Sequence, residues 1–282
     1  MIRRRREARK GYLLIAPLMI GCLVFYMISF GLVVQYSLTW DDNGLKNFRL
    51  LLENRIFRLA FWNTLRFLLT GLPLIMALAY AIALLLKKHA QKYKFLKSVL
   101  LFPYIMPVVG TVILVELLFA RYGAVNRGLY TLGLPVADWL GSDKAFYVVL
   151  ALYLWKNTGY SVILLMSGLV TIPEDHYDVA ALDGASALQQ FRYITVPQMW
   201  QSVFFAVVFS LINAFKCFRE IFLIGGTHPN SSIYMLQHFI NNNFENLNYG
   251  RLSVASILLF LVLTAAFALF YDWVGRKEAY RE

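Results

Sequence analysis

Hydrophobic residues along the chain gather in six long blocks, and polar residues fall mainly between them. The blocks cover residues 12–37, 61–86, 96–120, 145–169, 199–225 and 252–274. Each block is longer than the roughly 20 residues that an α-helix needs to cross the hydrocarbon of a bilayer. Because only helices and closed barrels satisfy the backbone inside lipid, the pattern predicts an all-α polytopic membrane protein with six transmembrane helices.

The composition favours a membrane protein over a soluble one. Of the 282 residues, 59% are hydrophobic and 15% are charged, and the mean hydropathy is +0.58. A soluble domain of ordinary composition carries charge on about 25% of its residues. The basic start, MIRRRREARK, precedes an apolar block that is too long for the core of a signal peptide. We therefore expect this block to be a retained first membrane helix.

The basic residues flank the apolar blocks, and their distribution predicts an orientation. With the amino terminus inside, the inner segments hold fifteen Lys and Arg residues and the outer segments hold eight. Because positive residues favour the cytoplasmic side, both termini are expected in the cytoplasm. The formal net charge of +11 is explained by these flanking residues, so we expect a lipid bilayer and no nucleic acid as a partner.

The segment 171–198 separates two apolar blocks but is too polar to cross a bilayer. Two pairs of residues in this segment have the spacing of a capping box, which marks the start of a helix. The pairs are Thr171 with Glu174 and Ser186 with Gln189. The segment is therefore expected to form two short helices joined at Asp183-Gly184, on the cytoplasmic surface. On these residues alone, it is either a docking surface for another protein or an elbow that only links two spans.

The spacing inside this segment carries a family resemblance. Counted from Asp178, the positions of Ala180, Gly184, Ile194 and Pro197 resemble the EAA loop of binding-protein-dependent ABC importer permeases. The string IPEDHYDVAALDGASALQQFRYITVPQM is similar to the version of this loop in sugar importers. Two departures are that Asp178-Val179-Ala180 stands in place of the family's Glu-Ala-Ala and that Val196 stands in place of its Leu.

The resemblance implies a type I ABC importer permease in a bacterial or archaeal inner membrane. In that family the loop is a coupling helix that docks on a cytoplasmic ATPase. Carried over residue by residue, the docking residues are Tyr177, Asp178, Ala180, Asp183 and Gly184. The implied organisation is a first helix with its outer loop in residues 1–57, a permease domain in 58–275 that contains the coupling loop 171–198, and a cytoplasmic tail in 276–282.

The same resemblance implies several partners. They are a second homologous permease, two cytoplasmic ATPase subunits, an extracytoplasmic substrate-binding protein and a carbohydrate substrate. The chain has no G-x-x-x-x-G-K-[ST] phosphate loop, so ATP and Mg²⁺ are expected in the partner ATPase. No cofactor, metal or catalytic residue is expected in this chain, since its four scattered histidines lack metal-ligand spacing. The alternatives are a permease for a polyamine or phosphate, and a polytopic membrane enzyme.

Ionisable residues inside the apolar blocks are candidates for a substrate path, because each costs about 2.5–3.5 kcal/mol to place in a membrane. Lys216 and Glu220 lie one helical turn apart and are close enough to pair. Tyrosines and amides accompany them, as suits a sugar whose ring face stacks while its hydroxyls form hydrogen bonds. The candidate path residues are Tyr153, Lys156, Asn157, Tyr160, Asn213, Lys216 and Glu220. The alternative is that these groups only join neighbouring helices.

The outer segment 225–250 opens with turn residues. Ser231 or Ser232 is expected to cap a helix there, with Leu236 and Phe239 on one side. The resemblance implies contact with the substrate-binding protein, and the alternative is an interfacial helix that lies on the membrane surface.

Overall fold

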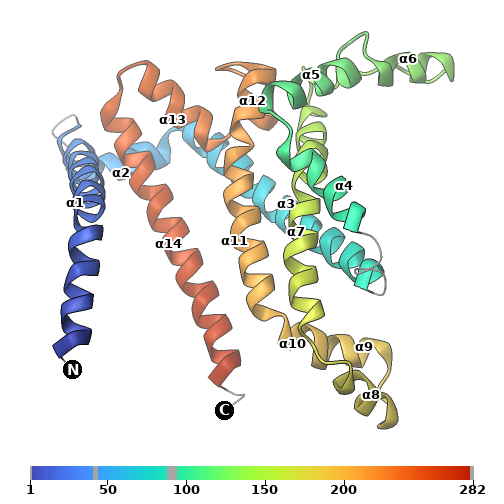
Figure 1. The fold of residues 1–282 in the computed structure, drawn as a ribbon. Helices are drawn as coiled ribbons and strands as arrows, with labels where there is room; N and C mark the ends of the chain where they lie inside the picture. Colours follow the sequence, from blue (N-terminus) through green and yellow to red (C-terminus); the bar gives the residue numbers. More distant parts are fainter. Residues whose placement is uncertain (1, 41–43, 88–93, 280–282) are drawn as a thin grey trace. The chain divides into compact units, whose positions relative to one another are not determined.

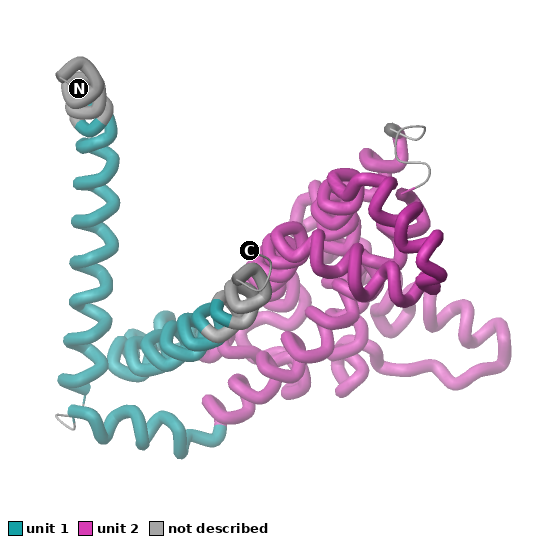
Figure 2. The backbone as a smooth tube through the Cα atoms, turned by 90° about the horizontal axis from the view of Figure 1, so that it is seen from below, with its two compact units in different colours: residues 1–55, 240–282 teal, residues 56–239 magenta. Residues whose placement is uncertain are grey.

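The computed structural model describes residues 2–40, 44–87 and 94–279, and within these ranges it contains helices and no strand. The all-α fold class is thus confirmed. Residues 88–93 of an expected inner segment and 280–282 of the expected tail lie outside the described residues. The chain forms two compact units, one of residues 1–55 with 240–282 and one of residues 56–239 (Figure 2). Figure 1 gives the order of the helices.

The first unit contains α1 (Ile2–Thr39), α2 (Lys46–Glu53) and α14 (Tyr249–Ala279). Helices α1 and α14 pack together, and the ring centroids of Phe30 and Phe260 lie 5.8 Å apart. The buried Asn47 side chain of α2 donates hydrogen bonds to the backbone oxygens of Ser37 and Trp40, at 2.9 and 2.6 Å. Because carbonyls at the end of a helix lack partners within it, this amide stabilises the turn from α1 into α2.

The second unit is built around α7 (Ala145–Val170), which packs against α4 and α11. Its first half, which includes Phe146, joins a core cluster with Phe67 and Ile221. The other helices of the unit are α3 (Arg55–Lys87), α4 (Lys94–Ile105), α5 (Val108–Phe119), α6 (Ala124–Thr131), α8 (Asp175–Leu182), α9 (Ala187–Gln190), α10 (Val196–Gln198), α11 (Trp200–Lys216) and α12 (Phe218–Gly225), and α13 (Leu236–Glu245) begins in it. A π-helical turn, Phe191–Thr195, joins α9 to α10.

Five helices in the described part of the chain are long and apolar enough to cross a membrane. They are Leu14–Thr39, Arg55–Lys87, Val108–Thr131, Ala145–Val170 and Tyr249–Ala268. Two of the six expected spans are interrupted: the third between α4 and α5, and the fifth between α11 and α12. Five of the predicted blocks therefore contain or overlap a candidate span, whereas the six-span count, the orientation and the domain bounds stay predictions.

The two interruptions have different causes. Pro107 precedes α5 with ψ of 144°, outside the helical region, and proline also disfavours a helical conformation in the residue before it. Cys217, between α11 and α12, keeps nearly helical angles of −59° and −16°. Its N–H still donates to Asn213 and its oxygen still accepts from Ile221. The fifth block is thus one long rod with a local irregularity at Cys217, as the line of α11 and α12 in Figure 1 shows.

Helices α4 and α7 approach so closely that only glycine fits at one crossing point. A Cβ atom placed on Gly159 would lie 1.8 Å from the backbone oxygen of Leu100. Small residues at such positions let helix backbones meet, which is a common way to join helices inside membranes. This contact holds α4 against α7 and brings Tyr104, near the end of α4, toward the centre of the unit.

We predict that Gly159→Ala destabilises the protein, because the α4 backbone must move to admit the methyl group. Overpacking of this kind costs about 1–3 kcal/mol. The matched control is Gly110→Ala in α5, where an added Cβ meets nothing within 4 Å. Thermal unfolding of the purified chain in detergent should show a Tm several degrees lower for Gly159→Ala, and an unchanged or higher Tm for the control. Equal Tm values for the two variants would contradict the close contact.

Candidate functional site

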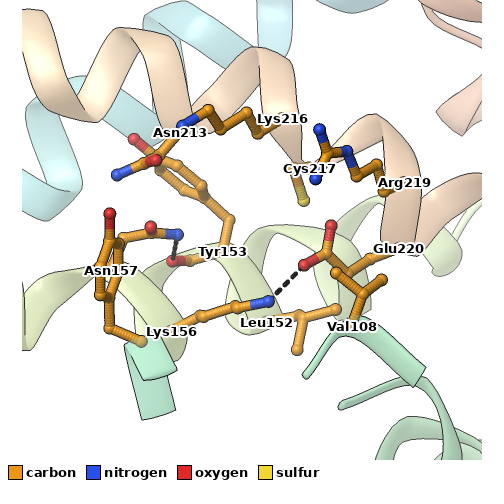
Figure 3. A pocket seen from close by; sticks show the side chains of 11 residues that line it. Val108, Leu152, Tyr153, Lys156, Asn157, Asn213, Lys216, Cys217, Arg219 and Glu220 are labelled. Atoms are coloured by element: carbon orange, nitrogen blue, oxygen red, sulfur yellow. Dashed lines mark hydrogen bonds and ion pairs between the residues drawn. The ribbon is translucent and has the colours of Figure 1, made fainter. Parts of the chain in front are cut away.

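A pocket of about 150 Å³ lies where α4, α5 and α7 meet the junction of α11 and α12 (Figure 3). Six of the seven residues expected along a substrate path line it, and these are Tyr153, Lys156, Asn157, Asn213, Lys216 and Glu220. Sequence reasoning missed three of the other lining residues, Tyr104, Val108 and Leu152. The last two lining residues, Arg219 and Cys217, were readable from the sequence, because Arg219 is a charged residue inside an apolar block and Cys217 shares a helix face with Asn213 and Glu220.

The seventh expected residue, Tyr160, is not among the residues that line the pocket. Its ring stacks on that of Tyr104, with centroids 4.8 Å apart and planes at 16°. It also meets Phe209 of α11 edge to face at 5.5 Å. Tyr160 of α7 therefore supports Tyr104, which lines the pocket, and packs α4, α7 and α11 together. For this residue the alternative holds, namely that the polar groups join neighbouring helices.

An ion pair joins two walls of the pocket. The Lys156 Nζ of α7 lies 2.5 Å from Oε1 of Glu220 on α12, and the two side chains are only 12% and 6% exposed. The suggested pairing of Lys216 with Glu220 is therefore wrong. The backbone hydrogen bonds continue across Cys217, so the helical spacing between Lys216 and Glu220 is kept. The pairing fails because the Glu220 carboxylate takes Lys156 of α7 as its partner.

Part of the polar set is used to hold the walls of the pocket in place. The Tyr153 hydroxyl donates to the backbone oxygen of Ser210 at 2.9 Å, which joins α7 to α11. The hydroxyls of Ser161 and Ser210 lie 3.2 Å apart, and the Asn157 side-chain amide donates to the backbone oxygen of Tyr153 at 2.8 Å. The Tyr153 hydroxyl and the Asn157 amide, which the sequence suggested as hydrogen-bond donors to a substrate, thus already donate to the backbone. Tyr153 thus shapes the pocket, and its hydroxyl is already satisfied.

The remaining polar side chains are open to the pocket. Within the described ranges, Lys216, Arg219 and the Asn213 side chain have neither a salt bridge nor a hydrogen bond to another residue. In Figure 3 the Lys216 side chain extends over Asn213, on the side of Cys217 away from Arg219. The pocket therefore combines one internally neutralised ion pair with two further cations and a carboxamide, all available to a ligand.

The segment 171–198 forms the two short helices that the sequence predicts. Helix α8 ends at Leu182, Gly184 turns the chain with φ of +78°, and α9 follows. The capping box of Ser186 and Gln189 is present, whereas the one suggested at Thr171 is not. The Thr171 hydroxyl donates back to Gly168 in α7, and α8 has no side-chain cap. Position 184 requires glycine, because a side chain strains the backbone at this φ.

The five expected docking residues differ in exposure. Asp178, Asp183 and Gly184 are exposed, and Ala180 is half-buried. Tyr177 faces inward: its hydroxyl lies 2.9 Å from the Thr195 hydroxyl, and Lys87 Nζ lies 4.1 Å from its ring centroid. Tyr177 therefore anchors the segment to the spans. No comparison bears on docking itself, so the docking role of all five residues stays a prediction.

Two leucines of this segment that sequence reasoning missed are highly exposed. Leu182 is 88% exposed and Leu188 is 74% exposed. Leucines in an otherwise polar segment were a signal that could be read from the sequence. Such leucines do not pack in a core of their own chain, which indicates contact with something outside it. Exposed apolar side chains beside Asp178 and Asp183 are typical of a surface that another protein covers.

The outer segment is tied to α3. The Asn63 side chain donates to the backbone oxygens of Ser231 and Tyr234, at 2.6 and 2.9 Å. The expected serine cap is wrong, because Asn230 Oδ1 accepts from the N–H of Ser232 and so caps a short 3₁₀ turn. The turn and its contacts lead the chain into α13, with Leu236 and Phe239 buried as expected.

His238 in this segment is fully buried. Its Nδ1 accepts a hydrogen bond from the Met235 N–H at 3.2 Å, and its Nε2 has no partner among the described residues. The Phe218 ring meets the imidazole nearly at right angles, with centroids 4.8 Å apart. Burial, reinforced by the nearby charge of His228, lowers the pKa of His238 to about 4, because the charged imidazolium loses its hydration.

We predict that the outer segment loses stability as the pH falls from about 6.5 to about 4. In this window an unfolded histidine binds a proton and the buried His238 does not, so the free energy of unfolding falls by up to about 3 kcal/mol. Hydrogen exchange of the α13 amides, corrected for intrinsic rates, should show less protection at pH 5 than at pH 7.5. His238→Phe should remove the difference, and His228→Gln, which removes only the smaller of the two causes, should keep most of it. Equal protection at both pH values would contradict the prediction.

Comparison with known proteins gives one family match and several full-length relatives. Residues 71–280 match the family described as binding-protein-dependent transport system inner membrane component. The trehalose/maltose transport system permease protein of Thermococcus litoralis is 31% identical over 281 residues, covering 96% of this chain and 95% of the relative. The sulfoquinovosyl glycerol permease protein of Agrobacterium fabrum is 27% identical, covering 90% and 88%.

Solved structures with the same fold include a bacterial ABC transporter that imports the acidic polysaccharide alginate. Its matching chain has a TM-score of 0.78 and 21% sequence identity, and the match covers 98% of this chain and 99% of that one. A second structure, with a TM-score of 0.77 and 20% identity, is of the alginate transporter in complex with a periplasmic protein bound to an alginate pentasaccharide. At these identities the similarity establishes the fold.

Proposed function

Because the chain belongs to the family of binding-protein-dependent transport system inner membrane components, we propose that it forms half of the translocation path of an ATP-driven saccharide importer. Membership makes it a multi-pass permease subunit of the inner membrane, and not an enzyme. The observation that carries the substrate class is the 31% identity with the trehalose/maltose permease protein over nearly the whole chain. The polyamine alternative is disfavoured, because a cationic solute is repelled by Lys216 and Arg219 in the pocket.

The pocket suits a saccharide in its chemistry. Asn213 offers an amide to hydroxyl groups, and Tyr104 offers a ring beside them. The fold is shared with a transporter solved with a periplasmic saccharide-bound protein, which supports an extracytoplasmic binding protein as the donor of substrate. In this proposal six spans cross the membrane with both termini in the cytoplasm, as the charge distribution favours.

The cytoplasmic segment of α8 and α9 is the proposed contact with an ATPase. The assembly contains a second homologous permease and two ATPase subunits, which bind ATP and Mg²⁺. Leu182 and Leu188 provide apolar contact, Asp178 and Asp183 provide charge, and Gly184 sets the turn that presents them. Tyr177 transmits movement of this segment to the spans through its contacts with Thr195 and Lys87.

We predict that Leu182→Asp weakens ATPase binding at least tenfold and removes saccharide-stimulated ATP hydrolysis, because it places a charge in an apolar contact. Membrane abundance should stay normal, since Leu182 is 88% exposed and supports no core. The matched control is Leu132→Asp, at a 75% exposed position on the expected outer side. Co-purification with the ATPase, and hydrolysis stimulated by the saccharide-loaded binding protein, measure both effects. Wild-type values for Leu182→Asp would refute the coupling role.

A further inference from the structure

The charges of the pocket do not balance. Three cationic side chains, Lys156, Lys216 and Arg219, line it together with one carboxylate, Glu220. Glu220 already contacts Lys156 at 2.5 Å, and that pair is nearly buried. Lys216 and Arg219 are therefore left without a neutralising partner in the part of this chain that the structure describes. A polar pocket at membrane depth thus keeps an excess of two positive charges.

The placement of these two cations has no evident structural use. They lie three residues apart on either side of Cys217, where like charges repel one another. Both are exposed and neither packs against a described aromatic ring. Charged residues inside apolar blocks are costly, so their retention facing a pocket indicates a ligand that offsets the charge.

We infer that the importer carries a saccharide with an anionic group, a carboxylate or a sulfonate, and that Lys216 and Arg219 are the residues that select it. This inference rests on the proposed function of the same pocket. The planar guanidinium of Arg219 matches a carboxylate or sulfonate with two parallel hydrogen bonds, and Lys216 adds a compact charge. The Asn213 amide, beneath Lys216 in Figure 3, is placed for hydroxyl groups of the same sugar.

The Lys156–Glu220 pair adds to this selectivity. Because Glu220 forms its ion pair with Lys156, it does not neutralise Lys216 or Arg219. The charge of Lys156 also weakens the repulsion between Glu220 and an anionic ligand. The pair also keeps α12 against α7, so that Arg219 stays beside the pocket. A neutral saccharide would leave Lys216 and Arg219 without a counter-charge in the pocket, whereas an anionic saccharide would offset them.

The test is uptake by proteoliposomes that contain the full complex, with the binding protein outside. The paired probes are digalacturonate against the neutral galactobiose of the same linkage, and a 6-sulfonated hexoside against its neutral parent. We expect uptake of at least one anionic member, about tenfold or more above its neutral counterpart. The two pairs distinguish a carboxylate from a sulfonate as the recognised group.

The variants then separate the pocket from the binding protein. The double variant Lys216→Gln/Arg219→Gln should reduce uptake of the anionic probe about tenfold or more. The affinity of the binding protein for the probe and the co-purification of all subunits should stay unchanged. Lys144→Gln, a cation outside this pocket, is the matched control and should transport normally. A charge-reversed variant, Arg219→Glu, should transport the anionic probe less well than Arg219→Gln, because the new carboxylate repels the anion. A purely structural role of Arg219 does not predict this difference.

Three results would overturn the inference. Uptake of neutral saccharides alone, unchanged in the double variant, would refute anion selection and leave the saccharide importer standing. Loss of the second permease from the double variant would show that acidic groups of that subunit neutralise Lys216 and Arg219. Uptake of inorganic phosphate and of no saccharide would refute the proposed function together with the inference.

Discussion

The ion pair between Lys156 and Glu220 is the contact on which the pocket depends. Two buried charges are tolerated when they meet at short distance, and removal of one leaves the other buried without a partner. Their meeting requires a fixed separation and rotation of α7 and α12, so the pair determines which side of α12 faces α7. Once Glu220 faces α7, Arg219 lies at the pocket, and Lys216 lies there on the other side of Cys217. The positive excess of the pocket follows from this arrangement.

The same helices connect the pocket to the segment 171–198. Helix α7 continues from Lys156 to Val170, just before α8, and α11 begins at Trp200, just after α10. One hydrogen bond, from the Tyr153 hydroxyl to the Ser210 backbone oxygen, joins α7 to α11 near the pocket. The Tyr177 hydroxyl of α8 contacts the Thr195 hydroxyl in the π-helical turn. Movement of α8 and α9 against an ATPase would therefore reach the pocket through α7 and α11, which are joined to each other near the pocket. This continuity is the physical basis of the proposed coupling.

Much of this organisation was readable from the sequence, for reasons that differ between features. Apolar blocks report helices directly, and glycine at position 184 reports a turn because few other residues adopt its φ of +78°. Sequence spacing failed where the partner came from another helix. Glu220 was assigned to Lys216 on its own rod, because nothing local shows that α7 brings Lys156 to within 2.5 Å. The Thr171 cap failed for a related reason, since its hydroxyl bonds back to Gly168, a choice that Ser and Thr side chains often make in helices.

The most direct test of this account is a double-mutant cycle on the ion pair. Lys156→Met and Glu220→Met each leave one buried charge unpaired, and we expect each to lower the free energy of unfolding by about 3–5 kcal/mol. The double variant removes both charges and should recover most of that loss, because similar apolar side chains fill the space. Unfolding of the purified protein by a denaturing detergent measures all four forms under the same conditions. Strong recovery in the double variant would establish the pair, and losses that simply add would contradict it.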